Sequence, residues 1–207
     1  MAKYTGPDCK QCRREGAKLF LKGAKCYTSK CTFDKRPLPP GQHGAGRKKV
    51  TEYGTQLREK QKVKKLYGLL EKQFHLYYVE ADRMRGETGK NMLQLLERRL
   101  DNVVYRMSLG SSRSLSRQLV NHGHITVNGK NVNIPSYIIK PGDAIAVKAS
   151  KADNNYFKEH KNRPHTVVPK WLEFDGNTLS GKVIALPERE DIDMDIRQQL
   201  IVELYSK

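Results

Sequence analysis

The middle of the chain carries apolar residues at helical spacing. They recur near a 3.6-residue period over residues 51–67, 70–81 and 92–104, and Gly68 stands where the first of these helices is expected to end. A similar stripe over residues 195–204 predicts a helix near the C-terminus. The stripes are typical of core-facing helices rather than of cofactor-binding segments.

The spacing changes in the second half of the chain. Residues 111–123 have serines at the start and a glycine at the end, which predicts a short capped helix. Alternation over residues 125–127 leads into Asn128-Gly129, a dipeptide favoured in two-residue hairpin turns because both positions need positive φ. Further strands at residues 144–147 and 183–186 would complete a small antiparallel sheet.

The first 50 residues lack a sustained apolar period and are rich in Gly, Pro, Lys and Cys, which predicts a loop region held by something other than a hydrophobic core. All four cysteines lie there, as Cys9-x2-Cys12 and Cys26-x4-Cys31. Two close pairs of thiolates can surround Zn²⁺ tetrahedrally and leave no position for water, so the site would be structural. An iron–sulfur cluster also takes four thiolates. Two disulfides or four unliganded thiols are the remaining alternatives.

Charge is concentrated at the N-terminal end. The 207 residues include 39 Lys plus Arg and 22 Asp plus Glu, a net charge of +17. Residues 1–65 hold 18 basic and 5 acidic side chains, residues 66–150 hold 12 and 7, and residues 151–207 hold 9 and 10. An excess of positive charge concentrated in one part of the chain is typical of a face that binds nucleic acid. A merely solvated basic face is the alternative, and a membrane surface is disfavoured because no amphipathic apolar stripe accompanies the charge.

Length and composition exclude several other classes. A chain of 207 residues holds one large or two small domains. No stretch approaches the roughly 18 apolar residues of a membrane span. The N-terminus has neither the apolar core nor the cleavage pattern of a targeting signal, so the cytosol is the expected location.

Three short motifs fall short of a catalytic or metal site. Gly89-Lys90 lacks the earlier glycine of a phosphate-binding loop. His122 and His124 have no acidic or further histidine neighbour in sequence that would complete a metal site. Arg99-Leu100-Asp101 resembles the catalytic aspartate motif of pseudouridine synthases, but Arg98 or Arg99 can neutralise the carboxylate, and the chain beyond is too short for that catalytic sheet. No enzyme active site is predicted.

Several phrases, in order, resemble one family over essentially the whole chain. They are Cys9-x2-Cys12-Arg13-Arg14-Glu15-Gly16, Pro39-Pro40-Gly41-Gln42-His43-Gly44, Leu57 to Lys62, Arg99 to Arg106, Leu119 to Gly129 and Gln199 to Ser206. In these phrases the chain is similar to the family of bacterial small-subunit ribosomal protein four, in its four-cysteine form. Some members of that family lack the cysteines, so the metal would be structural in this chain without being a general feature of the family.

The resemblance implies an α+β fold with three regions. Residues 1–45 would form a metal-stabilised, basic N-terminal loop region. Residues 46–97 would form a helical domain, joined by the C-terminal helix at 191–207. Residues 98–190 would form an antiparallel sheet packed on helices, containing a small helix–hairpin RNA-binding module.

The resemblance also implies a function. The protein would be a structural constituent of the small subunit that binds the five-prime domain of its rRNA directly, early in assembly. It would lie beside small-subunit proteins three and five, near the path by which messenger RNA enters, and would influence decoding accuracy. In some bacteria such a protein represses its own operon. A free RNA-binding regulator and an RNA-modifying enzyme are the competing classes; no membrane or small-molecule substrate is expected.

Two groups of residues are the candidates for these contacts. Three acids near the C-terminus, Glu188, Glu190 and Asp191, interrupt a basic chain and are predicted to face a basic ribosomal protein. Basic, amide and aromatic side chains suited to phosphates, 2′-hydroxyls and base stacking form the predicted RNA-binding set: Lys3, Tyr4, Arg13, Arg14, Arg47, Lys48, Lys49, Tyr53, Arg58, Lys62, Arg113, Arg117, Gln118, Asn121, His122, His124, Asn128 and Lys130.

Overall fold

The chain divides into two compact units in a computed structural model that describes residues 2–46, 49–161 and 168–206. The first, here the helical unit, comprises Met1–Met92 and Met194–Lys207; the second, here the sheet unit, comprises Leu93–Asp193. Among the described residues, none of the helices combines the length and the apolar character that crossing a bilayer requires.

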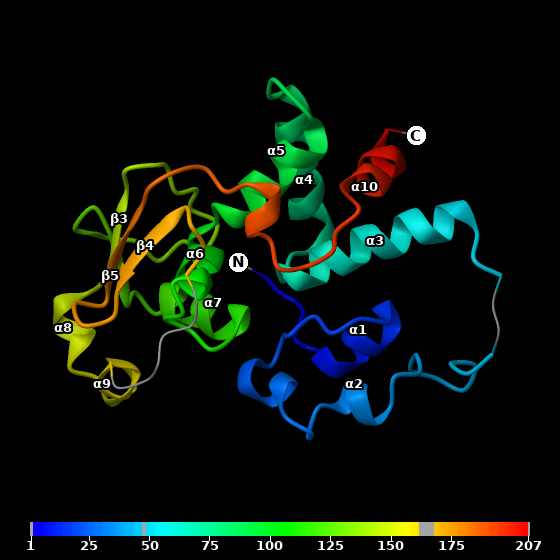
Figure 1. Cartoon of the computed structure of the whole chain (residues 1–207), viewed down its shortest axis with the longest axis horizontal. Coiled ribbons are helices and arrows are strands. Elements are labelled where there is room, and N and C mark those ends of the chain that lie inside the picture. The colour runs from blue at the N-terminus through cyan, green and yellow to red at the C-terminus, as the bar shows by residue number, and fades with distance from the viewer. Residues whose placement is uncertain (1, 47–48, 162–167, 207) are drawn as a thin grey trace. The chain divides into compact units, whose positions relative to one another are not determined.

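The helical unit begins with short elements and continues with long ones (Figure 1). The short ones are α1 (Asp8–Glu15), η1 (Gly23–Tyr27) and α2 (Thr32–Lys35), and the longer ones are α3 (Glu52–Leu66), α4 (Glu71–Arg83) and α10 (Gln198–Tyr205). The helix α5 (Thr88–Glu97) begins in this unit and ends in the sheet unit. The N-terminal 50 residues are therefore not only loop, since α1 completes two turns within them.

The C-terminal α10 packs on α3. Gln56 donates to Glu203 at 3.0 Å, and the Tyr205 hydroxyl donates to Glu71 at 2.8 Å. Burial alone would raise the pKa of Glu71, but hydrogen bonds from Lys60, Lys64 and Tyr205 lower it to about 2. The last helix is thus held by polar contacts in addition to the apolar stripe, in which Ile201 is fully buried.

Within the described part of the sheet unit, five strands form one antiparallel sheet, in the order β2 (Lys130–Asn131), β1 (Ile125–Val127), β3 (Ala144–Val147), β5 (Ser180–Val183) and β4 (Leu172–Asp175). Its apolar core includes Val103, Val120, Ile125, Ile145 and Phe157, all with no exposed surface. The elements are α6 (Leu100–Arg106), α7 (Arg113–Asn121), β1 (Ile125–Val127), β2 (Lys130–Asn131), β3 (Ala144–Val147), α8 (Ala149–Ala152), α9 (Asn155–Lys161), β4 (Leu172–Asp175), β5 (Ser180–Val183) and η2 (Arg189–Asp191).

Two predicted elements differ from the structure. The apolar run at 92–104 is not one helix: α5 ends at Glu97 and α6 begins at Leu100, because the Leu100 and Asp101 amides donate to Tyr137 and Pro135 carbonyls instead of continuing a helix. The last strand lies at 180–183 and not at 183–186. A Cβ at Gly181 would lie 2.3 Å from the Glu173 carbonyl oxygen, so this strand position requires glycine.

Candidate nucleic-acid interface and cysteine segment

The helix α7 and the hairpin after it form the candidate interface of the sheet unit. Ser112 caps the helix by accepting from the Leu115 amide at 3.3 Å, as predicted. Gly123, with φ of 67°, turns the chain toward β1. Leu119 and Val120 enter the core, while Gln118, Asn121, His122 and Lys130 are exposed. The local sequence signals therefore place four of the predicted side chains in solvent.

Arg113 is held in a defined position at the start of α7. Its Nε donates to the Asn102 side-chain oxygen at 2.9 Å, and its guanidinium lies 4.5 Å from the centroid of the Tyr105 ring. The side chain is partly exposed. Both supporting residues lie on α6, and sequence reasoning did not identify them, because no local spacing relates them to Arg113.

Arg117 differs from the prediction, which placed it on the polar face of the same helix. Only 4% of the residue is exposed, and its guanidinium lies 3.4 Å from the carboxylate of Asp101. Asp101 also pairs with the fully buried Arg99, at 2.8 Å. Because α6 packs against α7, the Arg117 side chain is turned inward to this carboxylate. The structure gives Asp101 two cationic partners, as expected for a structural aspartate.

The hairpin confirms its predicted turn. Asn128 has φ of 50° and Gly129 has φ of 77°, as a type I′ turn requires. The Asn128 side chain donates to Asp143 at 2.8 Å and accepts from the Ala144 amide at 2.9 Å. Asn128 is exposed, but its amide group is used to join the turn to the start of β3.

His124 is the most enclosed of the predicted polar residues around the hairpin. Burial lowers the pKa of His124, and the charges of Lys151 and His122 act in the same direction. Its ring lies 6.2 Å from that of His122 and 5.8 Å from that of Phe157. A lowered pKa favours the neutral form of the imidazole.

The predicted residues of the helical unit are distributed rather than gathered into one site. Three are used within the fold: Arg13 donates to the Leu38 carbonyl at 2.8 Å, Arg58 pairs with Glu15 at 3.1 Å, and Lys62 pairs with Glu59 at 3.2 Å. Arg47 and Lys48 lie outside the described residues. The exposed members are Lys3, Tyr4, Arg14, Lys49 and Tyr53.

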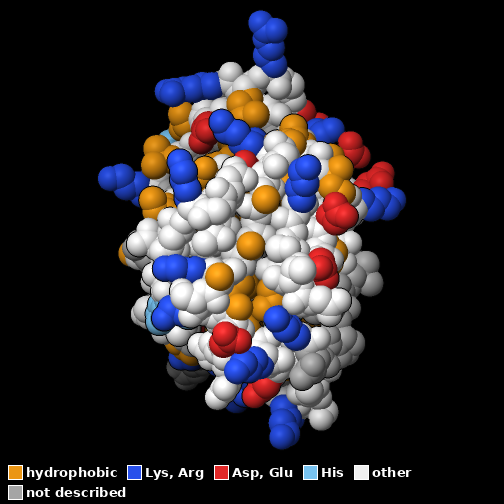
Figure 2. All heavy atoms as spheres, turned by 90° about the vertical axis from the view of Figure 1, so that its left-hand side faces the viewer, with side chains coloured by type: hydrophobic (Ala, Val, Ile, Leu, Met, Phe, Trp, Pro, Cys, Tyr) orange, Lys and Arg blue, Asp and Glu red, His pale blue; other side chains and the backbone are white. Residues whose placement is uncertain are grey.

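Surface charge in the structure is mixed on the face drawn in Figure 2, where Lys and Arg side chains spread widely and Asp and Glu side chains lie among them. Apolar side chains also reach this surface (Figure 2). Charge alone therefore does not mark a binding surface on this face.

The four cysteines are free thiols that influence one another. Cys12 and Cys31 are buried, while Cys9 and Cys26 are partly exposed. Burial raises the pKa of Cys12 and of Cys26; Cys26, Cys9 and Cys31 raise that of Cys12 further, and Cys31 and Cys9 do so for Cys26. The helix α1, which carries Cys9 and Cys12, packs against α2, which begins directly after Cys31. Within residues 2–46, 49–161 and 168–206, however, no group of three or more His, Cys, Asp or Glu side chains is arranged to hold a metal ion.

The acidic segment has a local explanation that the sequence did not reveal. Glu188 and Asp191 form a capping box around η2, with the Glu188 amide donating to the Asp191 carboxylate at 2.8 Å. Asp193 pairs with Arg106. Of the three acids predicted to contact a protein, Glu190 is the one whose side chain the cap does not use, and it is exposed.

The sheet unit thus combines a capped helix, a type I′ hairpin and an antiparallel sheet. Residues 3–97 match the family described as ribosomal protein S4/S9 N-terminal domain, and residues 98–145 match the S4 domain. The chain is 62% identical to small ribosomal subunit protein uS4 of Caldicellulosiruptor saccharolyticus, 61% identical to that of Ruminiclostridium cellulolyticum and 58% identical to that of Clostridioides difficile. Each of the three comparisons covers 100% of both chains.

The chain therefore belongs to the uS4 family of small ribosomal subunit proteins. This confirms the family resemblance carried by the sequence phrases, and the mixed helix and antiparallel-sheet structure agrees with the α+β fold that it implied.

Proposed function

We propose that this protein is a primary RNA binder that helps to nucleate small-subunit assembly through the five-prime domain of the rRNA. Membership of the uS4 family makes it a structural constituent of the small ribosomal subunit in the cytoplasm, binding rRNA, and not an enzyme. The observation that carries this function is the full-length match to ribosomal relatives. Co-sedimentation with the small subunit through a moderate-salt gradient tests it, since a free regulator would be recovered unbound and an RNA-modifying enzyme would show turnover.

The α7–hairpin surface is the proposed RNA contact of the sheet unit. Structured RNA is recognised through phosphates, 2′-hydroxyls and shape. Gln118, Asn121 and His122 supply directional hydrogen-bonding groups there, and Lys130 supplies charge. The hydrogen bond from Arg113 to Asn102 holds the arginine side chain in place, which limits the conformational entropy that it loses when its guanidinium binds a phosphate.

Arg113→Ala is expected to weaken rRNA binding and to flatten the dependence of log affinity on log salt by somewhat under one unit, because one phosphate contact is lost. Filter binding at several salt concentrations measures the slope. Lys182→Ala is the matched control, since Lys182 is exposed on β5, across the strand pair from Glu173. An unchanged slope in a folded Arg113→Ala protein would show that Arg113 does not meet phosphate.

The cysteine segment is proposed to hold one structural Zn²⁺ through Cys9, Cys12, Cys26 and Cys31, with an iron–sulfur cluster as the alternative. Their sulfur donors suit either group, and the packing of α1, which carries Cys9 and Cys12, on α2, which follows Cys31, supports their proximity. A bound metal ion would offset the repulsion between neighbouring thiolates and so stabilise their charged form.

Further partners are proposed from family membership. They are small-subunit proteins three and five and messenger RNA near its path into the subunit, with effects on decoding accuracy and, in some relatives, repression of the protein's own operon. Glu190 and its neighbours Glu188 and Asp191 are the proposed contact with a basic ribosomal protein, protein five being the leading candidate. Their charges oppose RNA binding and favour a cationic protein surface.

Neutralising Glu188, Glu190 and Asp191 together is expected to leave rRNA affinity equal or higher, to weaken the protein contact and to raise miscoding. Because two of these acids cap η2, Glu190→Gln is the critical variant: it removes one charge and keeps the capping box. Binding to purified protein five and misreading by reconstituted subunits are the measurements. Loss of rRNA binding or of folding with unaltered miscoding would mean that the acids are structural.

A further inference from the structure

Two aromatic rings form a stacked pair at the surface of the N-terminal segment. The centroids of Phe20 and Tyr27 are 4.9 Å apart and their planes are inclined by 25°. Tyr27 remains 70% exposed, more than Tyr4 at 48% or Tyr53 at 59%. Phe20 therefore supports the tyrosine ring while most of the Tyr27 side chain stays in solvent.

The backbone around this pair is held in an uncommon conformation. Phe20 has φ of 50°, in the left-handed region that bulky side chains rarely adopt. The 3-10 helix η1 then brings Tyr27 back to Phe20. Such strained residues persist where the surrounding structure determines them, and they are enriched at functional sites. The left-handed backbone at Phe20 therefore indicates that the position of the ring pair is determined by the surrounding fold.

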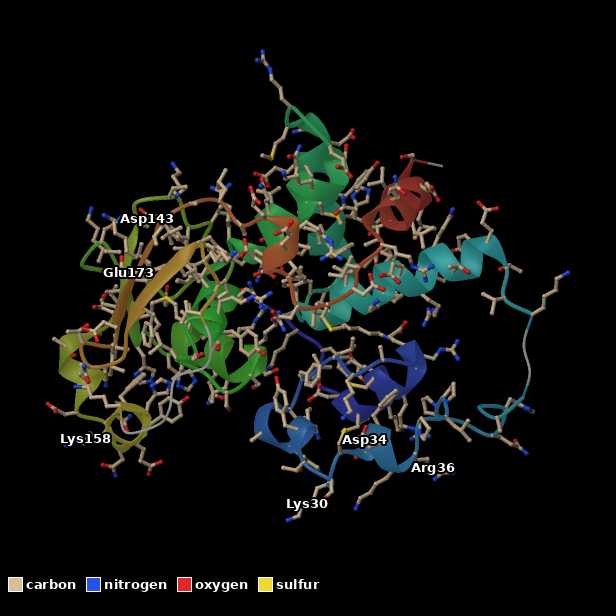
Figure 3. The ribbon with its side chains drawn as sticks, in the orientation of Figure 1. Lys30, Asp34, Arg36, Asp143, Lys158 and Glu173 are labelled. Carbon is tan, nitrogen blue, oxygen red and sulfur yellow. The ribbon has the colours of Figure 1, made fainter. Side chains whose placement is uncertain are left out.

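The surroundings of the ring pair are strongly basic. Residues 17–36 contain six basic side chains and one acidic one. That acid, Asp34, pairs with Lys18 at 2.6 Å. Lys22, Lys25 and Lys30 are exposed close to Tyr27 in the chain. Figure 3 shows Lys30 and Arg36 at the outer edge of this segment, directed away from the ribbon.

We propose that Tyr27, supported by Phe20, is a stacking platform for one unpaired base of small-subunit rRNA, with Lys22 and Lys25 binding the adjoining phosphates. The inference rests on the proposed RNA-binding function and deepens it. Every base has a π face, so an exposed aromatic ring within a cationic surface binds single-stranded nucleotides without reading their sequence. The local positive charge favours RNA over a basic ribosomal protein as the occupant.

The platform predicts that affinity and salt dependence respond to different substitutions. In filter binding of the full chain to transcribed small-subunit rRNA, Tyr27→Ala is expected to weaken binding by about tenfold with the salt slope unchanged, and Tyr27→Phe by less than about twofold, because stacking needs the ring and carries no charge. Lys22→Ala with Lys25→Ala is expected to flatten the slope by somewhat under two units. Tyr137→Ala, at a 41% exposed tyrosine of the sheet unit, is the matched control and should bind as the unchanged protein does.

A second measurement separates stacking from folding of the segment. Ultraviolet cross-linking followed by mass spectrometry is expected to give a nucleotide adduct on Tyr27 in the complex, and amide exchange over residues 8–36 of free Tyr27→Ala should match that of the unchanged protein. Equal affinity of Tyr27→Ala and the unchanged protein for naked rRNA, with no adduct, would overturn the platform and is also the result expected if a ribosomal protein covers Tyr27. Failure of the unchanged protein to bind rRNA would instead contradict the proposed function.

Discussion

Asp101→Ala is expected to destabilise the sheet unit by about 3–5 kcal/mol, since it removes a buried carboxylate that pairs with two buried arginines. Two partners are affected here. Arg99 has no exposed surface and donates twice to Asp101, at 3.1 and 2.8 Å. Arg117, 4% exposed, is the second. The loss should exceed that of an ordinary surface substitution by several-fold.

Urea unfolding followed by Trp171 fluorescence measures this effect, because Trp171 is the one tryptophan of the chain and is 2% exposed in the core of the sheet unit. Asp193→Ala is the matched control. Asp193 also pairs with a buried arginine, Arg106, but its own side chain is 79% exposed and Arg106 keeps its bonds to Glu97. The control should therefore change stability by less than about 1 kcal/mol. Equal midpoints and slopes for the two variants would contradict a structural role for Asp101.

The ion pair between Arg117 and Asp101 changes the expected effect of replacing Arg117 on RNA binding. A surface arginine on α7 would contribute to the salt slope, as Arg113 is expected to do. Arg117 is buried, so its removal should weaken RNA binding only through displacement of α7 and should leave the slope unchanged in molecules that remain folded. The two arginines, four positions apart on one helix, thus have different proposed roles.

Local signals in the sequence were sufficient for α7 and the hairpin. Ser112, Gly123 and Asn128-Gly129 each act through backbone conformation or a hydrogen bond within a few residues, and such effects depend little on the remaining fold. The orientation of Arg117 depends instead on Asp101, which is supplied by another helix. Helical periodicity assigns an arginine to the polar face and cannot anticipate an internal carboxylate.

The helix α9 and the position of β5 could not be predicted from the sequence either. α9 lies in a charged segment, and Phe157 is its fully buried apolar residue. Its Tyr156 hydroxyl donates to the Leu109 carbonyl at 2.8 Å. The helix is therefore positioned by the core of the sheet unit and by specific hydrogen bonds such as those of Tyr156 and of His160, which donates to the Ser108 carbonyl at 2.6 Å. Neither kind of contact produces an amphipathic stripe. The same holds for β5, whose position depends on the close approach of Gly181 to Glu173.

Removal of metal is expected to disorder mainly the first 45 residues and to leave the longer helices and the sheet folded. Binding free energy in small metal-stabilised segments is folding free energy, and residues 1–45 have few buried apolar side chains, of which Leu19 is fully enclosed. By contrast, α3 buries Val63 and Leu66. Freshly purified protein should contain about one metal ion per chain, and a content below about half a metal ion per chain would contradict the proposal.

Hydrogen exchange before and after chelation should show a graded loss of protection within that segment. The Glu15 side chain, 1% exposed, pairs with Arg58 at 3.1 Å and with Lys65 at 2.5 Å, so the end of α1 keeps an attachment to α3 that does not depend on metal. Protection should therefore fall more in η1 and α2 than near Glu15.

Because burial and neighbouring thiols raise the pKa of Cys12 and Cys26, protons compete more strongly for these ligands, and metal affinity should fall as the pH is lowered. Cys12→Ser should reproduce the chelated pattern, whereas unchanged protection of residues 16–36 after metal loss would show that side-chain packing alone holds the segment.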